Sequence, residues 1–173
     1  MAEIHAAAFV RLRPWTAAEF AALLSGTGMF VANDGAACTS PPSRGEGMGV
    51  GGPFEGNPLN PSLPHEGAGR SPAPAGFLLG RALAGEAEVL TLAVRPEAQG
   101  QGLGSALMAR FLAEAAARGA ARAFLEVAAD NDVARRLYAR HGFVEAGLRR
   151  GYFALMGGGA VDGIVMARDL PVS

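Results

Sequence analysis

The residues that most clearly indicate a chemical function form a glycine-rich turn, QGQGLG at residues 99–104. The turn follows an apolar segment at 89–94 that is typical of a strand, and it opens a segment with helical spacing at 105–118. The first N–H groups of a helix have no intrahelical partner and carry partial positive charge, which suits a phosphate. Because glycine has no Cβ, the backbone can approach such a ligand closely. The turn therefore predicts a binding site for a phosphorylated cofactor.

The spacing of these glycines narrows the choice of cofactor. A dinucleotide-binding turn needs a third glycine, whereas here Ala106 follows Ser105. A nucleotide-binding P-loop needs a Lys-Ser/Thr pair, which the turn lacks. The pattern that remains is Gln-x-x-Gly-x-Gly. A tight strand-to-helix turn that binds no ligand is the alternative for a glycine pattern taken alone.

Composition limits the class of protein. A length of 173 residues suits one domain, 1–173, and a hydrophobic content of 50% can supply a packed core. The net charge of −1 gives no reason to expect nucleic acid or an anionic membrane as a partner. The start of the chain has no secretory signal, no apolar run reaches the ~20 residues of a membrane span, and Cys38 is a single cysteine. We expect no metal and a cytoplasmic location.

A compositional break separates two parts of the predicted domain. Residues 35–75 hold eight of the 11 prolines and nine of the 25 glycines, with few aliphatic residues and no periodicity. Such a segment buries too little apolar surface to offset its ordering entropy, so we predict a long disordered insert. Short apolar segments at 29–32 and 76–80 flank it. Loop closure costs little more as loops lengthen, so we expect these two strands to pair antiparallel.

The remaining elements alternate along the chain. Ile4, Ala8, Phe9 and Leu12 fit one face of a short first helix, and Thr16 is a plausible N-cap for a second helix at 17–24. Strands are predicted near 28–33, 75–83, 86–94, 122–128, 143–153 and 162–169, with helices at 102–118 and from a cap at Asp130 or Asn131 to Arg140. This order predicts an α/β mixed sheet, mostly antiparallel, with one β-α-β crossover and helices on both faces.

Several segments together resemble the GNAT N-acetyltransferases, and within them the RimI-like branch that acetylates an alanine of ribosomal proteins. These are the glycine turn with Leu92-Ala-Val94, FLEVAADN at 124–131, ARRLYARHGF at 134–143, RRGYF at 149–153 and RPWTAAEF at 13–20. The resemblance covers most of 1–34 and 75–173 and implies the GNAT fold. Two features depart from it. The sequence starts at the expected first helix, so we expect either that the usual first strand is missing or that the true start lies upstream. The second departure is the 35–75 insert.

Glu126 and Tyr138 are the predicted catalytic residues. Glu126 is a single carboxylate in an apolar strand, where burial should raise its pKa and make it a better base, and the resemblance assigns the same role. The alternative is an ionised side chain that points to water. The resemblance also implies that Tyr138 protonates the departing sulfur, and the alternative is a tyrosine that packs beside Leu137 on an amphipathic helix.

The resemblance implies acetyl-CoA as the donor. Backbone groups of Leu92, Ala93 and Val94 should align its pantetheine arm as an added strand would. Asn131 would add a side-chain bond, or cap its helix. Arg149, with Arg150, and Tyr152 would shape the acceptor site, unless the arginines lie on a solvated face. The residues expected to hold the diphosphate are those of the glycine turn: Gly100, Gln101, Gly102, Leu103, Gly104 and Ser105.

These residues lead to one function and two alternatives. The main hypothesis is direct acetyl transfer to the N-terminal α-amine of a protein, and the resemblance points to the alanine of a small-subunit ribosomal protein. A model α-amine has a pKa of ~8, so its deprotonation at neutral pH costs only about 1 kcal/mol. The alternatives are a GNAT enzyme for a small amine or a lysine side chain, and a catalytically silent acyl-CoA-binding module.

Overall fold

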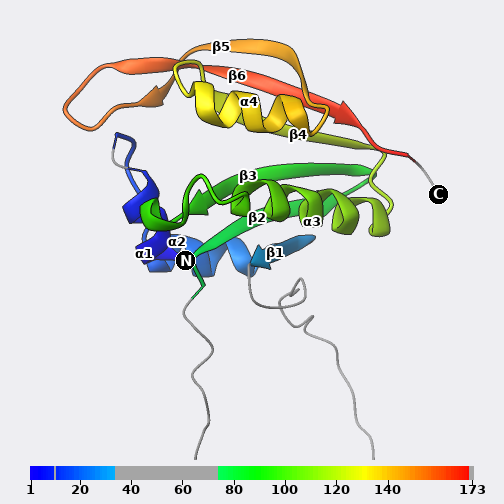
Figure 1. Cartoon of the computed structure of the whole chain (residues 1–173). Coiled ribbons are helices and arrows are strands. Elements are labelled where there is room, and N and C mark those ends of the chain that lie inside the picture. The colour runs from blue at the N-terminus through cyan, green and yellow to red at the C-terminus, as the bar shows by residue number, and fades with distance from the viewer. Residues whose placement is uncertain (10, 34–73, 172–173) are drawn as a thin grey trace, which may run out of the picture. The chain divides into compact units, whose positions relative to one another are not determined.

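The structure is a computed structural model that describes residues 1–9, 11–33 and 74–171 (Figure 1). Nearly all of the predicted 35–75 insert, with Cys38 and His65, lies outside these residues. Among the residues described, no helix is long and apolar enough to cross a membrane. The elements, in chain order, are α1 (Ala2–Ala8), α2 (Ala17–Leu24), β1 (Met29–Asn33), β2 (Gly76–Leu83), β3 (Glu86–Val94), a 3-10 turn (Pro96–Ala98), α3 (Leu103–Ala117), β4 (Arg122–Ala128), α4 (Asp132–Arg140), β5 (Val144–Ala154) and β6 (Ala160–Asp169).

The six strands form one sheet in the order β1-β2-β3-β4-β6-β5. β3 and β4 are parallel and are joined through α3, whereas every other neighbouring pair in the sheet is antiparallel. The predicted pairing of β1 with β2 is confirmed, from Met29 opposite Arg81 to Asn33 opposite Phe77. The predicted α/β fold, a mixed and mostly antiparallel sheet, is therefore confirmed, and a helix is the first of the described elements.

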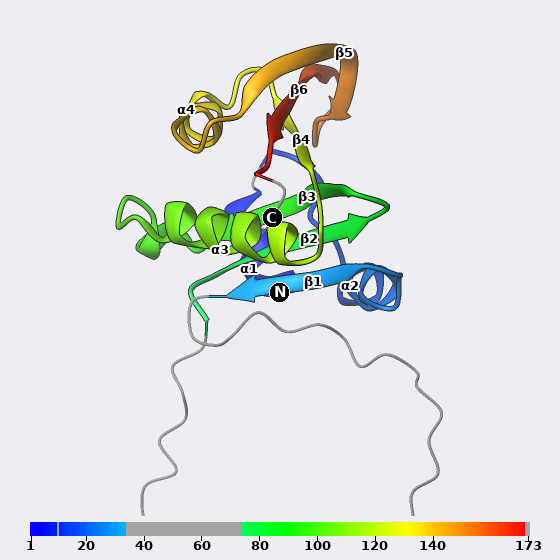
Figure 2. The ribbon, with the colours of Figure 1, turned by 90° about the vertical axis from the view of Figure 1, so that its right-hand side faces the viewer.

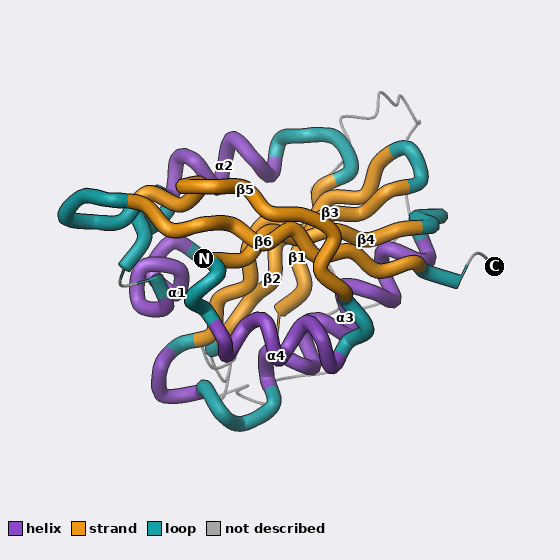
Figure 3. Tube along the Cα trace, turned by 90° about the horizontal axis from the view of Figure 1, so that it is seen from above, coloured by secondary structure: helices purple, strands orange, loops and turns teal. Residues whose placement is uncertain are grey.

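Helices cover both faces of the sheet. α3 and α4 pack on one face, called here the α3 face, over a core that includes Leu107, Phe111 and Tyr138. α1 and α2 pack on the other, the α1 face, where Ile4 and Phe20 meet side chains of β1, β2 and β3. Figure 2 shows α3 and α4 on one side of the strands and α2 on the other, and the view from above in Figure 3 separates α2 from α4 in the same way.

Local sequence explains where α2 begins. Thr16 Oγ1 accepts the backbone N–H of Glu19, and the Glu19 carboxylate in turn accepts the N–H of Thr16. This reciprocal pair is a capping box, which satisfies backbone donors that a helix start leaves unpaired. The N-cap predicted at Thr16 is confirmed. The prediction for α1 was too long, because the helix ends at Ala8 and Leu12 instead forms a β-bridge with Leu155.

Gly80 sets how closely α3 approaches the sheet. A Cβ at this position would lie 2.6 Å from Cε2 of Phe111 and 3.0 Å from Cζ of Phe30. Both rings are fully buried and stacked, with their centroids 5.5 Å apart, so neither has room to move. The missing side chain lets Phe111 rest directly on β2, which fixes the middle of α3 against the sheet.

Candidate active site

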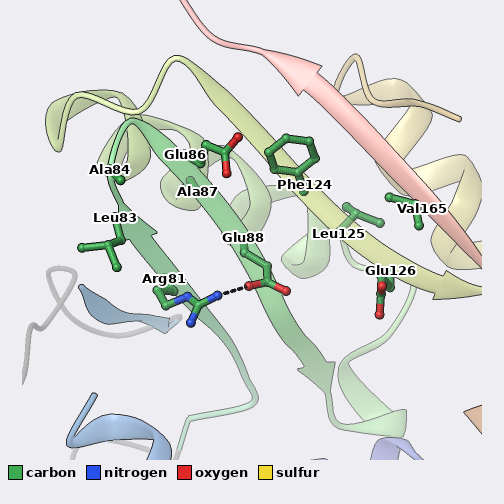
Figure 4. A pocket seen from close by; sticks show the side chains of 10 residues that line it. All are labelled: Arg81, Leu83, Ala84, Glu86, Ala87, Glu88, Phe124, Leu125, Glu126 and Val165. Atoms are coloured by element: carbon green, nitrogen blue, oxygen red, sulfur yellow. Dashed lines mark hydrogen bonds and ion pairs between the residues drawn. The ribbon is translucent and has the colours of Figure 1, made fainter. Parts of the chain in front are cut away.

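The parallel strands β3 and β4 part at the centre of the sheet. Their pairing runs only from Glu86 opposite Arg122 to Val89 opposite Leu125. Beyond that point β3 continues to pair with β2 as far as Val94, and β4 continues to pair with β6 as far as Ala128. Figure 4 shows the two strands diverging toward Glu126. The inner edges of Leu92, Ala93, Val94 and the end of β4 are therefore available to an extended ligand, at the carboxyl ends of parallel strands.

A bulge in β3 coincides with this divergence. Val89 pairs with Gly80 and Thr91 pairs with Leu79, so Leu90 is an extra residue in β3. A bulge bends its strand and increases the local twist. This local bend turns β3 away from β4 immediately after the last parallel pair.

The glycine turn stands at the end of β3 and leads into α3. Gly100 has φ 74° and Gly102, the N-cap of α3, has φ 82°, which favours glycine at both positions. A Cβ at either glycine would meet nothing within 4 Å, so the reason for glycine is the backbone conformation rather than crowding. The N–H groups of Leu103, Gly104 and Ser105 form the first turn of a 15-residue helix, where intrahelical acceptors are lacking. This is the geometry expected of an anion-binding turn.

Side-chain hydrogen bonds stabilise the glycine turn. The Gln99 amide donates to the carbonyl of Val94 at 3.0 Å, and the Gln101 amide donates to the carbonyl of Glu97 at 3.0 Å. Ser105 Oγ lies 2.8 Å from Nε2 of His141, at the C-terminal end of α4. Burial first, then Arg168 and Arg140, lower the pKa of His141. Backbone groups, rather than these side chains, remain available for a ligand.

Glu126, Arg149 and Tyr152 meet on the α1 face. The Glu126 carboxylate accepts a hydrogen bond from Nη1 of Arg149 within an ion pair. The Arg149 guanidinium carbon lies 3.8 Å from the centroid of the Tyr152 ring, and a hydrogen bond with Glu126 is the main reason that the pKa of Tyr152 is raised. The three predicted residues are thus brought together. The premise of an isolated, buried carboxylate is wrong, because the Glu126 side chain is 27% exposed and paired with an arginine.

Tyr138 lies on the α3 face instead. Its ring is buried in the core and meets Phe143 edge to face, with a centroid distance of 6.3 Å. Burial raises the pKa of Tyr138 to about 12, so the phenol keeps its proton at neutral pH. A buried, protonated phenol can pack as a core residue and can also donate a proton, and the geometry is compatible with both of the predicted alternatives.

Asn131 caps α4. Its side-chain oxygen accepts the N–H of Ala134 at 3.1 Å, which confirms the capping alternative. Contact between Asn131 and a donor stays a prediction. The side chain remains exposed beside the end of β4.

A loop and a hairpin meet beside the site. Leu12, between α1 and α2, bridges Leu155 at the turn between β5 and β6, and the Met156 N–H donates to the carbonyl of Arg11 at 3.0 Å. Arg11 also forms an ion pair with Asp130, with 2.7 Å between Nη1 and Oδ2. These contacts fix the two segments that border the α1 side of the diverging strands.

A cavity of about 460 Å³ adjoins Glu126 on the α1 face (Figure 4). It follows β2, β3 and β4 away from the glycine turn and includes an ion pair between Arg81 and Glu88. In the described part of the chain, no three His, Cys, Asp or Glu side chains gather in a way that could hold a metal ion.

Thr91 is a candidate site residue that the sequence analysis did not single out. It is 7% exposed, and its hydroxyl oxygen has no hydrogen-bond partner. The available signal was a single hydroxyl within the apolar run at 89–94. A hydroxyl at such a position pairs with something when it is buried, which makes the residue a candidate for ligand contact.

The parted β3–β4 pair, with the glycine turn at the end of β3 and the Glu126 carboxylate on β4, is suited to an extended ligand that carries an anionic group. The sequence profile of the acetyltransferase (GNAT) family matches residues 56–143, half of the chain, and the chain belongs to this family.

The chain is also similar to named enzymes. It is 41% identical over 99 residues to the [ribosomal protein bS18]-alanine N-acetyltransferase of Escherichia coli K12, covering 57% of this chain and 65% of that enzyme. It is 43% identical over 91 residues to the N-alpha-acetyltransferase RimI of Mycobacterium tuberculosis, covering 53% of this chain and 54% of that protein. The matched segments therefore span less than two thirds of these relatives. The crystal structure of the E. coli ribosomal-protein-S18-alanine N-acetyltransferase aligns with a TM-score of 0.69 and 28% identity, over 99% of this chain and 85% of that one.

Proposed function

We propose that this chain transfers an acetyl group from acetyl-CoA to the N-terminal α-amine of a protein, with the N-terminal alanine of a small-subunit ribosomal protein as the acceptor. A cytoplasmic setting goes with this substrate. The observation that carries the proposal is the parting of β3 from β4 between the glycine turn and Glu126. The names of the similar enzymes in E. coli and M. tuberculosis support the choice of acceptor.

The donor would lie across the sheet. Its diphosphate would take the N–H groups at 100–105, and its pantetheine arm would follow the free edge of Leu92, Ala93 and Val94. The thioester would then reach the gap between β3 and β4, which is open to both the α3 face and the α1 face. Tyr138 lies on the first of these faces and Glu126 on the second, so the two residues would address the thioester from opposite sides.

The reaction then needs one base and one acid. Glu126 accepts a proton from the acceptor amine, whose nitrogen attacks the thioester carbonyl carbon. A C–N bond forms, the C–S bond breaks, and the Tyr138 phenol gives its proton to the sulfur. Holding the two substrates together supplies much of the rate, because it removes the entropy cost of their encounter. Arg149 and Tyr152 fix the Glu126 carboxylate and border the acceptor.

Two assays test this function and its alternatives. Isothermal titration should show acetyl-CoA binding to the full chain, and mass spectrometry should show acetylation of peptides that begin with alanine. A panel that varies the first residue and blocks either the α-amine or the lysine side chains identifies the amine that reacts. Acetylation of lysine side chains or free polyamines alone would favour the small-amine enzyme. Binding without any transfer would favour the silent module.

A further inference from the structure

Thr91 is a residue of β3 with a buried hydroxyl group, and the proposed mechanism gives that hydroxyl no role. Its oxygen has no hydrogen-bond partner within the described chain, although the residue is 7% exposed. Buried hydroxyls are normally paired, so an unpaired one marks either a structural defect or the place of a ligand. Its position in the sheet decides between these two.

Register places the Thr91 side chain on the α1 face. Thr91 pairs with Leu79 and Ala93 pairs with Phe77, and directly paired residues of antiparallel strands project to the same face. Leu79, Phe77 and Ala93 all belong to the cluster beneath α1 and α2. Thr91 therefore faces away from α3, on the face of the sheet that also carries Glu126.

Register also places Thr91 one residue beyond Leu90, the position of β3 that follows the last parallel pair as Glu126 does on β4. The last parallel pair joins Val89 to Leu125, and one further residue on β4 is Glu126. On β3 the extra residue Leu90 intervenes, so Thr91 is the next residue that pairs in the ladder with β2. The hydroxyl and the carboxylate thus stand on the same face, on the two strands, where those strands begin to part.

We propose that Thr91 Oγ1 accepts a hydrogen bond from the acceptor α-amine and holds it against Glu126, an inference that rests on the proposed function. An entering ammonium has several N–H donors. Glu126 accepts one of them and takes that proton, which frees the nitrogen lone pair. Thr91 accepts a second N–H that stays on the nitrogen, and so directs the lone pair toward the thioester carbon. In this step one proton moves from the amine nitrogen to the Glu126 carboxylate, and no other group is transferred.

The inference is tested with full-length Thr91→Val, which keeps the side-chain shape and removes the hydroxyl. Thr91→Ser restores a hydroxyl, Thr91→Ala is a second deletion, and Thr27→Val is a matched change at an exposed turn. Each variant is assayed for kcat and KM on an alanine-first peptide at saturating acetyl-CoA, for acetyl-CoA affinity by titration, and for thermal unfolding.

We expect Thr91→Val to lower kcat/KM for the peptide by about tenfold, the loss that one hydrogen bond supports. Its acetyl-CoA affinity should be unchanged and its Tm equal or higher, because the unpaired hydroxyl is gone. Thr91→Ser should keep most of the activity, and Thr27→Val all of it.

Wild-type kinetics in both Thr91→Val and Thr91→Ala would overturn the inference and leave the hydroxyl a structural defect. An equal loss in Thr91→Ser would overturn it as well, since packing would then explain the effect. A wild-type chain that acetylates no peptide α-amine would instead refute the proposed function, and the inference with it. The wild-type assay thus separates the two failures.

Discussion

Lowering the pH from 7 to 5 should destabilise the fold through His5, a buried residue of helix α1. His5 is 3% exposed and stacks on Phe9, with ring centroids 4.1 Å apart. Its Nδ1 accepts the backbone N–H of Trp15 at 3.2 Å, which requires that this nitrogen carry no proton. Burial lowers the pKa of His5 to about 4, against a smaller opposing effect of Glu19. The folded protein therefore favours the neutral form of the His5 imidazole.

The sign and size of the effect follow from linkage. Between pH 6.5 and pH 4 the unfolded chain binds a proton at His5 that the folded chain does not, so stability rises with pH in this window. The contribution is fully present above the unfolded pKa of 6.5 and is lost as the pH falls toward 4. The full lowering of the His5 pKa corresponds to about 3 kcal/mol in the free energy of unfolding, of which about 2 kcal/mol is lost between pH 7 and pH 5.

Urea unfolding of the wild type and of His5→Gln at pH 7 and pH 5 measures this effect. A glutamine oxygen can still accept from Trp15 but does not titrate, so the variant should lose about 2 kcal/mol less than the wild type. His141 titrates in both proteins and cancels. The pKa of Glu19 is lowered to about 2, chiefly by its hydrogen bond from Arg13, so that carboxylate loses its contribution only below pH 4.5. An equal pH dependence in both proteins would refute the reasoning.

Three further substitutions test the core and the two proposed catalytic residues. Gly80→Ala should destabilise the fold by about 2 kcal/mol in urea unfolding, because the new methyl overlaps Phe111. Gly147→Ala in exposed β5, where the methyl meets Val165 atoms only at 3.8 Å, is the control that should change little; equal losses would contradict the packing argument. Glu126→Gln should lower kcat by about a hundredfold with unchanged acetyl-CoA affinity, and wild-type turnover would exclude it as the base. Tyr138→Phe should slow single-turnover transfer by about tenfold or more at unchanged Tm, and an unchanged rate would leave it a packing residue.

Local features of this fold could be predicted well from the sequence. The N-cap at Thr16 and the glycines at 100 and 102 depend on near neighbours in the chain, and both were found at the expected places. Helix α3, predicted at 102–118, spans Leu103–Ala117. Propensity and capping act over a few residues, which is why such elements can be recognised without knowledge of the rest of the fold.

The environment of the site could not be predicted in the same way. Arg149 reaches Glu126 because β4 and β5 both pair with β6, a pairing between distant segments that no local pattern specifies. The bulge at Leu90 likewise depends on the register of β3 with β2. The sequence therefore suggested an isolated carboxylate at Glu126, while tertiary pairing supplied it with a cation and left Thr91 unpaired.

The central claim is that backbone N–H groups at 100–105 hold the donor diphosphate, so that the thioester enters between β3 and β4 beside Glu126. A crystal structure of the full chain with acetyl-CoA tests it most directly. We expect the diphosphate at the first turn of α3, the pantetheine arm along Leu92–Val94, and the thioester carbon within reach of an amine held at Glu126. Acetyl-CoA seated elsewhere on the chain, with β3 and β4 closed on each other, would contradict this account.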